Sequence, residues 1–374
     1  MVSDNRTFDV IVVGAGIMGV AAAWELARRN HSVLVLEQYD LGHARGSSHG
    51  YARIFRLAYE NEEYVALALA ARNDWRQLEL ESGADLLLTN GAFDLGPSRL
   101  LNPIENALVA AGASVDRIVE FPDGLIAGVR VPDDWEALYQ PDGGTLAAAR
   151  CFETFVDHAR AAGAIFRPET AAVSVRTSDG SARVETIHGT VGAQCIVITA
   201  AGWAEPLLRP LGIAVPIRVT REHVAYYQDH GQEPIHPFIW HPDDGSPQIY
   251  GLPSMSDSTV KIGRHIAGRQ VEPSSKPELD PRETARITGF VRDQIPRLGT
   301  SPRAETCLYA STPDDDFIID RVGPIILGLG FGGHGFKFAP AVGSLIADLV
   351  VDTPIAWADR FSLKRFDAEP QYAH

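Results

Sequence analysis

A glycine-rich turn near the start of the chain limits what the sequence can fold into. Gly14, Gly16 and Gly19 follow a continuous apolar run over residues 8–13, and a helical pattern occupies 17–29. Residues 32–36 form a second predicted strand, which completes a βαβ unit of about 30 residues. At such a turn, bare backbone N–H groups and the positive end of a helix can hold a pyrophosphate. The sequence therefore predicts a Rossmann-like unit that binds a dinucleotide.

Glu37 lies where the second predicted strand ends. A carboxylate at this position accepts hydrogen bonds from a ribose 2′-OH and disfavours a 2′-phosphate. NAD and FAD both contain an ADP half, so these residues alone do not choose between the two cofactors. An NAD-dependent dehydrogenase stays open at this point.

Composition limits the partners of the chain. Its 374 residues include 33 Lys and Arg against 48 Asp and Glu, a formal net charge of -15. Such a surface repels polyanions, so we expect no nucleic-acid partner. Met1 to Thr7 is polar, and no apolar run approaches the roughly 20 residues that cross a bilayer. We therefore expect a cytoplasmic protein without membrane contact. The cysteines, Cys151, Cys195 and Cys307, lie far apart, which predicts neither a disulfide framework nor a metal site.

The middle of the chain changes architecture. A helix predicted over 60–82 ends at Gly83, and Asn90-Gly91 between apolar segments predicts a hairpin. A helix is predicted from the turn at 141–144 to about 162. Short strands over 171–176, 183–187 and 194–199 then form a predicted β-meander.

The second half adds further antiparallel strands over 217–265 and a helix that starts at Asp280 with Pro281 in its first position. A strand at 325–329, a glycine-rich loop and a helix from about 340 to 351 close the chain. This order repeats the strand, loop and helix of the N-terminus.

Two later strands can carry chemistry on one face. The strand period of two places Lys261, Gly263 and His265 on one face, opposite Val260, Ile262 and Arg264. If that face is solvent, Lys261 is an ordinary surface charge. If it meets a flat cofactor, a cation there stabilises the superoxide formed when oxygen takes the first electron.

Cys307 and Tyr309 share a strand face in the same way, although pattern alone favours an inert thiol and a core tyrosine. Lys337 follows the glycine-rich loop and can stabilise an anionic flavin or pair with a carboxylate, unless it is a surface lysine. The long loop over 42–56 is rich in Gly, His and Arg. Its arginines can serve a diphosphate, a reduced flavin or a carboxylate.

Together these segments resemble the monomeric sarcosine oxidase and N-methyltryptophan oxidase family, among the amine-oxidising flavoproteins that include D-amino acid oxidase. The resemblance covers nearly the whole chain. Its motifs, in chain order, are the Gly14-Gly16-Gly19 turn, Gly46-Ser47-Ser48-His49-Gly50 with Arg53-Ile54-Phe55-Arg56, Tyr250-Gly251-Leu252-Pro253, Lys261-Ile262-Gly263-Arg264-His265, Cys307-Leu308-Tyr309 with Asp316-Phe317-Ile318-Ile319-Asp320, and Gly333-His334-Gly335-Phe336-Lys337-Phe338.

The resemblance implies an α/β fold: a Rossmann-like FAD-binding domain with a β-meander, and an α+β substrate domain built on an antiparallel sheet. We expect residues 1–82, 146–216 and 311–374 in the FAD-binding domain. Residues 83–145 and 217–310 are expected in the substrate domain.

The resemblance also implies roles for single residues. FAD would be bonded covalently to Cys307, with Lys261 as the oxygen-activating cation and Arg53 near the reactive edge of the flavin. Arg56 and Lys337 would bind the substrate carboxylate. The remaining expected site residues are Tyr250, His265 and Tyr309 lining the pocket, with Ser48, His49 and the backbone around Gly333 at the cofactor.

The chain departs from the family pattern in three places. Ser48 precedes His49 where relatives often have two histidines, and Ala52 stands in place of a threonine. The segment 238–245 is longer than in sarcosine oxidases and carries Trp240, which we expect to contact the substrate.

The expected activity is oxidation of a secondary amino acid by a monomer, with a hydride equivalent passing to the flavin, the imine hydrolysed and O2 reduced to H2O2. Sarcosine, N-methyltryptophan, fructosyl amino acids, pipecolate and proline are the alternative substrates. A flavin subunit that passes electrons to a partner is a rival from another class.

Overall fold

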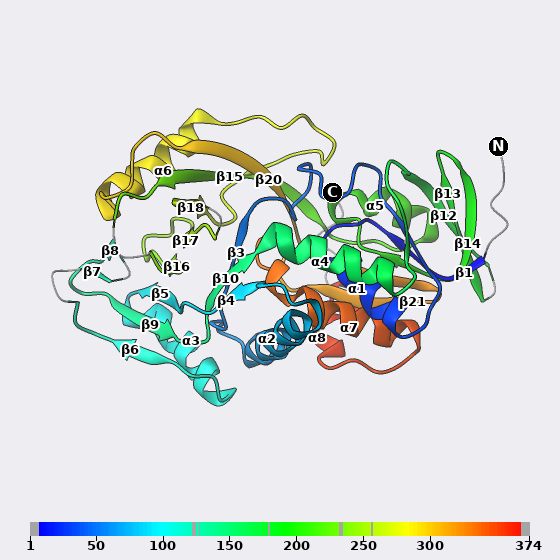
Figure 1. Cartoon of the computed structure of the whole chain (residues 1–374), viewed down its shortest axis with the longest axis horizontal. Helices are drawn as coiled ribbons and strands as arrows, with labels where there is room; N and C mark the ends of the chain where they lie inside the picture. The colour runs from blue at the N-terminus through cyan, green and yellow to red at the C-terminus, as the bar shows by residue number, and fades with distance from the viewer. Residues whose placement is uncertain are drawn as a thin grey trace. The chain divides into compact units, whose positions relative to one another are not determined.

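The computed structural model describes residues 7–121, 125–126, 128–178, 180–231, 235–255 and 257–367. The polar start, Met1 to Arg6, on which the expected location partly rests, lies outside them. The chain divides into two compact units, both drawn in Figure 1. The first unit comprises Met1–His49, Phe152–Val219 and Tyr309–His374, and the second comprises Gly50–Cys151 and Thr220–Leu308.

The first unit is built on a mainly parallel sheet. Its strands are β1 (Thr7–Val13), β2 (Val33–Leu36), β11 (Ile165–Arg167), β12 (Ala172–Ser178), β13 (Ser181–Thr186), β14 (Gly189–Ile198), β21 (Ile318–Val322) and β22 (Ile325–Leu329). The order is β11-β2-β1-β14-β13-β12, and β22 pairs with the end of β14 in parallel and with β21 in antiparallel fashion. Strands β12, β13 and β14 are the predicted meander, which is confirmed.

Helices α1 (Ile17–Arg28) and α7 (Ala339–Val350) of the first unit pack against each other, as Figure 1 shows. Gly343 permits their close approach, because a Cβ there would lie 2.9 Å from the backbone of Ala21. Alternate residues of β1, Ile11 and Val13, belong to the buried apolar cluster of this unit. The glycine turn between β1 and α1 is thus anchored at both ends.

The second unit contains a larger sheet and a smaller one. The larger sheet has the order β19-β15-β18-β17-β16-β5-β9-β6 with β20 beside β15, and the smaller has the order β3-β10-β4. The strands are β3 (Ala52–Phe55), β4 (Leu87–Leu88), β5 (Ala92–Gly96), β6 (Asp116–Ile118), β9 (Glu136–Gln140), β10 (Gly144–Ala147), β15 (Arg218–Gln228), β16 (Phe238–Trp240), β17 (Ile249–Pro253), β18 (Thr259–Arg264), β19 (Arg269–Gln270) and β20 (Arg303–Ser311), with a separate pair β7 (Leu125–Ile126) and β8 (Val129–Arg130).

Helix α6 (Pro281–Gln294) covers one face of the larger sheet, as Figure 1 shows beside β15 and β18. The helix begins as predicted: Asp280 accepts a hydrogen bond from the Arg282 backbone N–H at 2.9 Å. Ile287 and Val291 then join the buried cluster that contains Ile262. The other helices of the unit are α2 (Glu62–Ser82) and α3 (Ser98–Ala110), and α4 (Ala148–Ala161) follows β10.

The hairpin predicted at Asn90-Gly91 is wrong. Strand β4, before this turn, pairs with β10, whereas β5, after it, pairs with β9 and β16 in the other sheet. Gly91 does have a positive φ of 76°, but its N–H bonds to the Gly143 carbonyl. The turn moves the chain from one sheet to the next, and local sequence does not distinguish that route from a hairpin.

The unit boundaries also differ from the predicted domain ranges. Residues 50–82, expected with the cofactor domain, belong to the second unit. The reason is the pairing of β3 with β10, in which Arg53 lies opposite Leu146. Residues 145–147, expected in a helix, belong to β10, and α4 begins after them. The fold class inferred from the sequence is confirmed.

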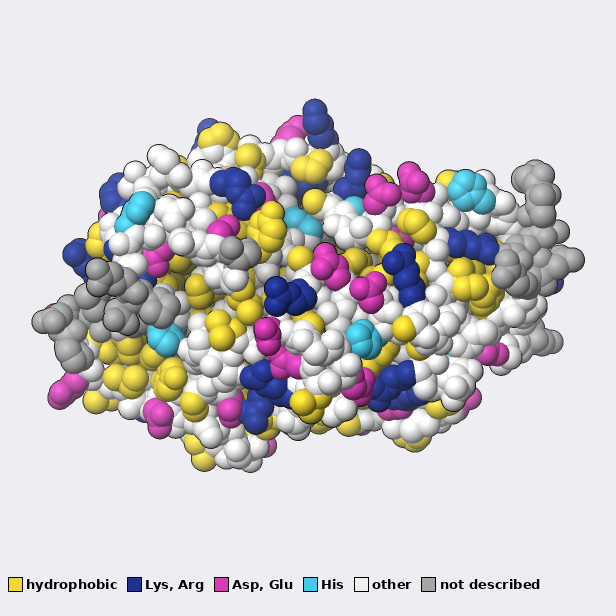
Figure 2. Space-filling model, viewed as in Figure 1, with side chains coloured by type: hydrophobic (Ala, Val, Ile, Leu, Met, Phe, Trp, Pro, Cys, Tyr) yellow, Lys and Arg dark blue, Asp and Glu magenta, His cyan; other side chains and the backbone are white. Residues whose placement is uncertain are grey.

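Figure 2 shows basic side chains scattered among acidic ones on the visible face, without a continuous basic stripe. Within the described ranges, none of the helices combines the length and the hydropathy needed to span a membrane.

Candidate active site

The glycine turn of the first unit has no room for side chains at two of its positions. Gly14 has a φ of 101°, and a Cβ there would lie 2.8 Å from the Thr199 carbonyl oxygen. A Cβ on Gly19 would lie only 1.9 Å from the carbonyl oxygen of Gly14. The Thr199 hydroxyl donates to that same oxygen at 2.8 Å. The turn is therefore fixed against the end of β14 and requires glycine.

Helix α1 starts at this turn without an acidic residue in its first turn and without a side chain of its own as cap. Ser48, from the predicted Gly-Ser-Ser-His segment, supplies a partner instead: its Oγ accepts the Ile17 N–H at 3.0 Å. A Cβ on Gly16 would lie 3.3 Å from the same Oγ. Ser48 thus lies at the positive end of the helix, the place predicted for a pyrophosphate, and His49 is the next residue.

Glu37 is buried and joins the second strand to the glycine turn. Its Oε2 accepts the Ala15 N–H at 2.9 Å and its Oε1 accepts the Tyr39 N–H at 3.0 Å. His43 Nε2 lies 3.4 Å from Oε1. Because a carboxylate oxygen has more than one acceptor site, these bonds leave capacity for ribose hydroxyls.

The glycine-rich loop after β22 carries Gly333 and ends in a short helical turn with Lys337. Gly332 N–H bonds to the Ala310 carbonyl at 3.0 Å, which attaches the loop to the end of β20, next to Tyr309. Lys337 is only 4% exposed, and its Nζ donates to the His334 carbonyl at 3.1 Å. A lysine this deeply buried is a functional candidate rather than a surface charge.

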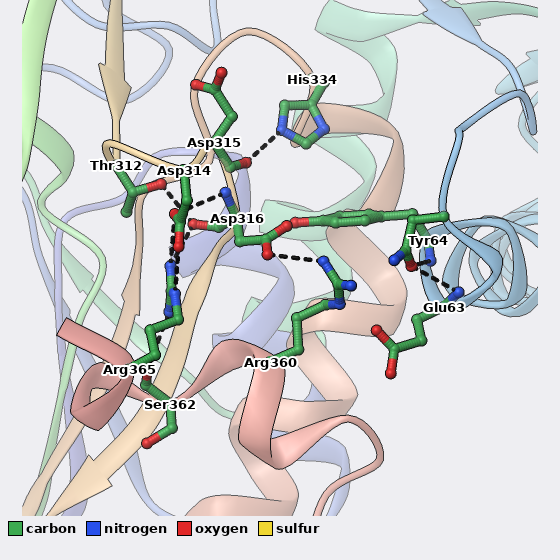
Figure 3. Close-up of polar contacts among 11 residues, drawn as sticks. Glu63, Tyr64, Thr312, Asp314, Asp315, Asp316, His334, Arg360, Ser362 and Arg365 are labelled. Atoms are coloured by element: carbon green, nitrogen blue, oxygen red, sulfur yellow. Dashed lines mark hydrogen bonds and ion pairs between the residues drawn. The ribbon is translucent and has the colours of Figure 1, made fainter. Parts of the chain in front are cut away.

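A network of acids and arginines supports this loop from outside, as Figure 3 shows. His334 Nε2 lies 3.1 Å from the Asp315 carbonyl oxygen. Arg360, on the short helix α8 (Ala358–Phe361), bonds to Asp316 at 2.8 Å, and Arg365 bonds to Asp314 at 2.8 Å. The segment near the C-terminus therefore holds the turn between β20 and β21, on which the loop rests.

The larger sheet of the second unit has two different faces. Val260 and Ile262 belong to the apolar cluster under α6, and Arg264 pairs with Glu283 of α6 at 2.5 Å. Lys261 and Gly263 therefore lie on the opposite face, and the division predicted from the strand period is confirmed. We call this the site face. His265 follows the last residue of β18, and its N–H bonds to the Gln248 carbonyl at 2.8 Å.

Strand register extends the site face across the sheet. Gly263 lies opposite Tyr250, Tyr250 opposite Ile239, and Ile239 beside Asp94. A Cβ on Gly263 would lie 2.6 Å from the Tyr250 ring, so the phenol lies over the glycine. Tyr250 therefore occupies a central position on this face.

Lys261 is buried on the site face, close to Arg53 and Cys307. Burial and the positive charge of Arg53 lower the pKa of Lys261 to about 7, against the opposing influence of Cys307 and Glu305. Burial likewise raises the pKa of the Cys307 thiol, while Lys261 and Arg53 oppose the rise. The structure thus brings together Lys261, Arg53 and Cys307, which lie far apart in the sequence. Their roles in catalysis stay predictions.

Glu222 of β15 fixes the turn that follows β18. Its Oε2 accepts the backbone N–H groups of Ala267 and Gly268 at 3.0 and 2.9 Å, and the Thr220 hydroxyl donates to Oε1 at 2.5 Å. Glu222 is 1% exposed, and these donors satisfy its charge. The turn that begins at His265 is held in place by this carboxylate.

Arg56 lies just beyond β3. Its Nη1 lies 3.6 Å from Oδ1 of the buried Asp94 and also donates to the Ala58 carbonyl. The guanidinium lies over the Tyr59 ring, 4.8 Å from the ring centre. The contacts with Asp94, Ala58 and Tyr59 therefore hold Arg56 in place.

Trp240 packs in the apolar cluster under α6. Its ring centre is 4.3 Å from that of Trp135 and 5.3 Å from that of Phe290. Ile239, its neighbour in β16, is the residue that shares the site face with Tyr250. This packing gives Trp240 a structural function, and its predicted contact with substrate is untested.

Sequence reasoning missed Asp94 and Tyr226 on the site face. Asp94 is a single acid in the apolar strand Ala92-Phe93-Asp94-Leu95-Gly96, and such an acid must be paired when it is buried. This lone acid in an apolar strand could therefore have identified Asp94 from the sequence. Tyr226 is one of two adjacent tyrosines in β15, and only the pairing with β18 shows which of them joins Lys261.

These residues fit an ADP-containing redox cofactor. The glycine turn presents backbone N–H groups without obstruction by Cβ atoms, and Glu37 offers acceptors beside it. On the site face, the buried Lys261 and the partly buried Arg53 lie next to a thiol, a donor set suited to an electron-rich ring.

Comparisons with known proteins give the same result. A family model described as FAD dependent oxidoreductase matches residues 9–349. Monomeric sarcosine oxidase of Bacillus sp. (strain NS-129) is 32% identical over 361 residues, covering 91% of this chain and 92% of that protein. N-methyl-L-tryptophan oxidase of Shigella flexneri is 30% identical over 363 residues, covering 92% and 95%.

A solved structure is also similar throughout. The open form of NikD, described as an unusual amino acid oxidase essential for nikkomycin biosynthesis, matches with a TM-score of 0.85 at 26% identity, covering 96% of this chain and 98% of that one. The resemblance inferred from the sequence motifs is therefore confirmed, and FAD rather than NAD is the dinucleotide. The family model and the relatives match most of the chain, including the glycine turn of the first unit and the sheets of the second. The chain therefore belongs to the FAD-dependent oxidoreductase family.

Proposed function

We propose that this protein is an oxidase that removes two electrons from a secondary amino acid, N-methyl or cyclic, and passes them to O2, releasing H2O2. The product imine is hydrolysed in water. Similarity to a sarcosine oxidase and to an N-methyl-L-tryptophan oxidase supports this substrate class. The chain is proposed to act as a monomer, as the name of the Bacillus relative states for that protein.

The observation that carries the proposal is the burial of Lys261 beside Arg53 and Cys307 on the site face. Among the described residues Lys261 has no ion pair within 4 Å, and a buried lysine of this kind is costly to keep unless its charge is used. Lys261 holds a proton on Nζ below about pH 7, where it stabilises the negative charge that develops on oxygen.

The cofactor contacts are proposed for each unit separately. The glycine turn is proposed to bind the FAD pyrophosphate, with Ser48 and His49 nearby and Glu37 accepting from the ribose. The backbone around Gly333 and the charge of Lys337 complete the set. Bound FAD supplies a two-electron acceptor that O2 can reoxidise. Cys307 is proposed to carry the flavin covalently, since its thiol lies among the cations that would face the ring.

Substrate binding is assigned to charged and aromatic side chains. Arg56 and Lys337 are proposed to bind the carboxylate, because a charged hydrogen bond contributes about 1.5–3 kcal/mol. Tyr250, His265 and Tyr309 are proposed to shape the pocket, and Trp240 to influence it. Fixing the carboxylate orients the reacting C–H bond, which lowers the entropic barrier.

Oxygen uptake with a panel of amines tests the proposal. The panel contains sarcosine, N-methyl-L-tryptophan, L-proline, L-pipecolate and a fructosyl amino acid, with glycine as the primary amine. The matched control is dimethylamine, which has the N-methyl group of sarcosine but no carboxylate. We expect peroxide from at least one secondary amino acid and none from dimethylamine. Reduction of the flavin without peroxide would instead indicate a subunit that passes electrons to a partner.

A further inference from the structure

A buried polar network surrounds Arg56 on the site face of the second unit. Asp94 of β5 is completely buried. His241 Nε2 lies 2.7 Å from its Oδ1, and Gln140 Nε2 donates to its Oδ2 at 2.7 Å. Arg56 Nη1 lies 3.6 Å from Oδ1. A single carboxylate thus contacts one cation, one imidazole and one amide.

The second layer of this network fixes its orientation. Gln248 Nε2 lies 3.0 Å from His241 Nδ1, so an amide hydrogen donated there leaves the ring proton on Nε2, directed at Asp94. Gln140 Oε1 accepts the N–H groups of Leu57 and Ala58 at 2.9 and 2.8 Å. These two backbone groups follow Arg56 directly, so the network holds the backbone of Arg56 as well as its charge.

The charge on Asp94 is maintained against burial. Burial by itself raises a carboxyl pKa, but the charge of Arg56 and the bonds from His241 and Gln140 outweigh it and keep the pKa of Asp94 below its ordinary value. Tyr59, under the guanidinium, has a pKa raised by burial and stays neutral. Asp94 is therefore the negative charge beside Arg56 in this network.

Arg56 is only partly committed to Asp94. A distance of 3.6 Å is longer than a direct charged hydrogen bond. Within the described part of the chain, its hydrogen bond and its ion pair both involve Nη1. The remaining donors of the guanidinium fork can serve a bound carboxylate.

We infer that Asp94, held by His241 and Gln140, is a positioning residue that fixes Arg56 and neutralises part of its charge, so that a substrate carboxylate competes with Asp94 for the guanidinium. Asp94 then limits how tightly a carboxylate binds, which permits product release. His241 assists binding, because its N–H shares the charge of Asp94 and leaves more of the charge of Arg56 for the ligand. The inference rests on the proposed role of Arg56 in carboxylate binding.

Calorimetric titration of the holoenzyme with acetate and with acetamide tests this charge balance. Asp94→Asn keeps the shape of the side chain and removes the competing charge, so the dissociation constant for acetate should fall about tenfold. That for acetamide should change by less than about twofold, because acetamide is neutral. In turnover, KM should fall more than kcat changes. An equal effect on both ligands would overturn the inference.

His241 gives an effect of opposite sign. His241→Leu removes the donor to Asp94, which then draws more strongly on Arg56, so acetate should bind about threefold to fivefold more weakly. His241→Gln keeps an N–H in reach of Asp94 and should restore most of the affinity. If Asp94→Asn and His241→Leu both weaken acetate binding, the residues only maintain the fold and the inference fails.

Arg56→Ala separates this inference from the proposed function. If this variant discriminates acetate from acetamide as well as the wild type does, the assignment of the carboxylate to Arg56 fails. If it loses discrimination while Asp94→Asn has no effect, the assignment stands and only the role of Asp94 fails.

Discussion

Tyr226 lies directly opposite Lys261 in the antiparallel pairing of β15 and β18, so both side chains leave the same face of the sheet. A Cβ on Gly50 would lie 3.5 Å from both the Tyr226 hydroxyl and Arg53 Nη1, so both groups border the space beside this glycine. Burial and the nearby charge of Glu305 raise the pKa of Tyr226, so the phenol stays neutral. The charge of this patch that changes near neutral pH is therefore that of Lys261.

Replacement of Lys261 by Met should slow the reaction of the reduced enzyme with O2 far more than reduction by substrate. The loss of one preorganised charge lowers such a rate about 100-fold. Stopped-flow absorbance measures the two half-reactions separately. Equal slowing of both would refute the assigned role.

The rate constant for the reaction with O2 should fall as the pH rises through about 7. The pKa of Lys261 is lowered to about 7 by burial and by Arg53, so the cation is present below this pH and lost above it. Lys261→Arg provides the control, because a guanidinium keeps its charge and should give a flat profile. A wild-type rate that is constant from pH 6 to 9 would contradict this prediction.

Stability should depend on pH through the same group. In the unfolded chain the pKa of Lys261 returns to about 10.5, so above pH 7 the unfolded state binds more protons than the folded state. The free energy of unfolding therefore rises with pH from about 7 to 10.5, as the cost of burying the charge disappears. In urea titrations, Lys261→Met should be stabilised relative to wild type at pH 6, and the difference should shrink by pH 9.

Cys307→Ser should leave the flavin bound to the protein without a covalent link. Serine is close to isosteric with cysteine but does not form the thioether, so the cofactor should be held without a covalent bond. Acid precipitation checks this: colour should stay in the pellet for the wild type and for Cys151→Ser, and move to the supernatant for Cys307→Ser. Soluble colour from the wild type would exclude covalent attachment.

Gly19→Ala should abolish FAD binding or unfold the first unit, because the new Cβ would lie 1.9 Å from the Gly14 carbonyl oxygen. Gly289→Ala is the matched control within helix α6, where a Cβ meets nothing within 4 Å. That change should stabilise the protein by roughly 0.5–1 kcal/mol, since alanine favours helix. Flavin content and thermal unfolding measure both outcomes. A Gly19→Ala variant with full flavin content would contradict the close approach at this turn.

Local patterns were enough to predict much of the fold. The βαβ unit around Gly14, the meander over β12 to β14 and the cap at Asp280 each depend on a few consecutive residues, and each is present. The two faces of β18 also followed from the period of two, because Val260 and Ile262 alternate strictly with Lys261 and Gly263.

Relationships between distant strands could not be predicted in this way. The residues around Asn90-Gly91 have hairpin chemistry, yet β4 and β5 find partners in different sheets. Likewise Asp94 meets His241 because β5 and β16 pair in parallel. Sequence shows which residues can ionise, but the register that brings them together is a property of the whole sheet.

Successive residues of β16, β17 and β18 alternate between two faces of the sheet, and the two faces tolerate different substitutions. Phe238 and Ile262 hold α6 and must keep their volume, whereas Ile239, Tyr250 and Gly263 point the other way. Under the proposed function, changes at Ile239 or Tyr250 would alter which amine is accepted, while Phe238 and Ile262 keep the packing against α6. A library restricted to Ile239 and Tyr250 would vary the site face and leave the apolar packing under α6 unchanged, whereas Gly263 must stay glycine because a Cβ there would lie 2.6 Å from the Tyr250 ring.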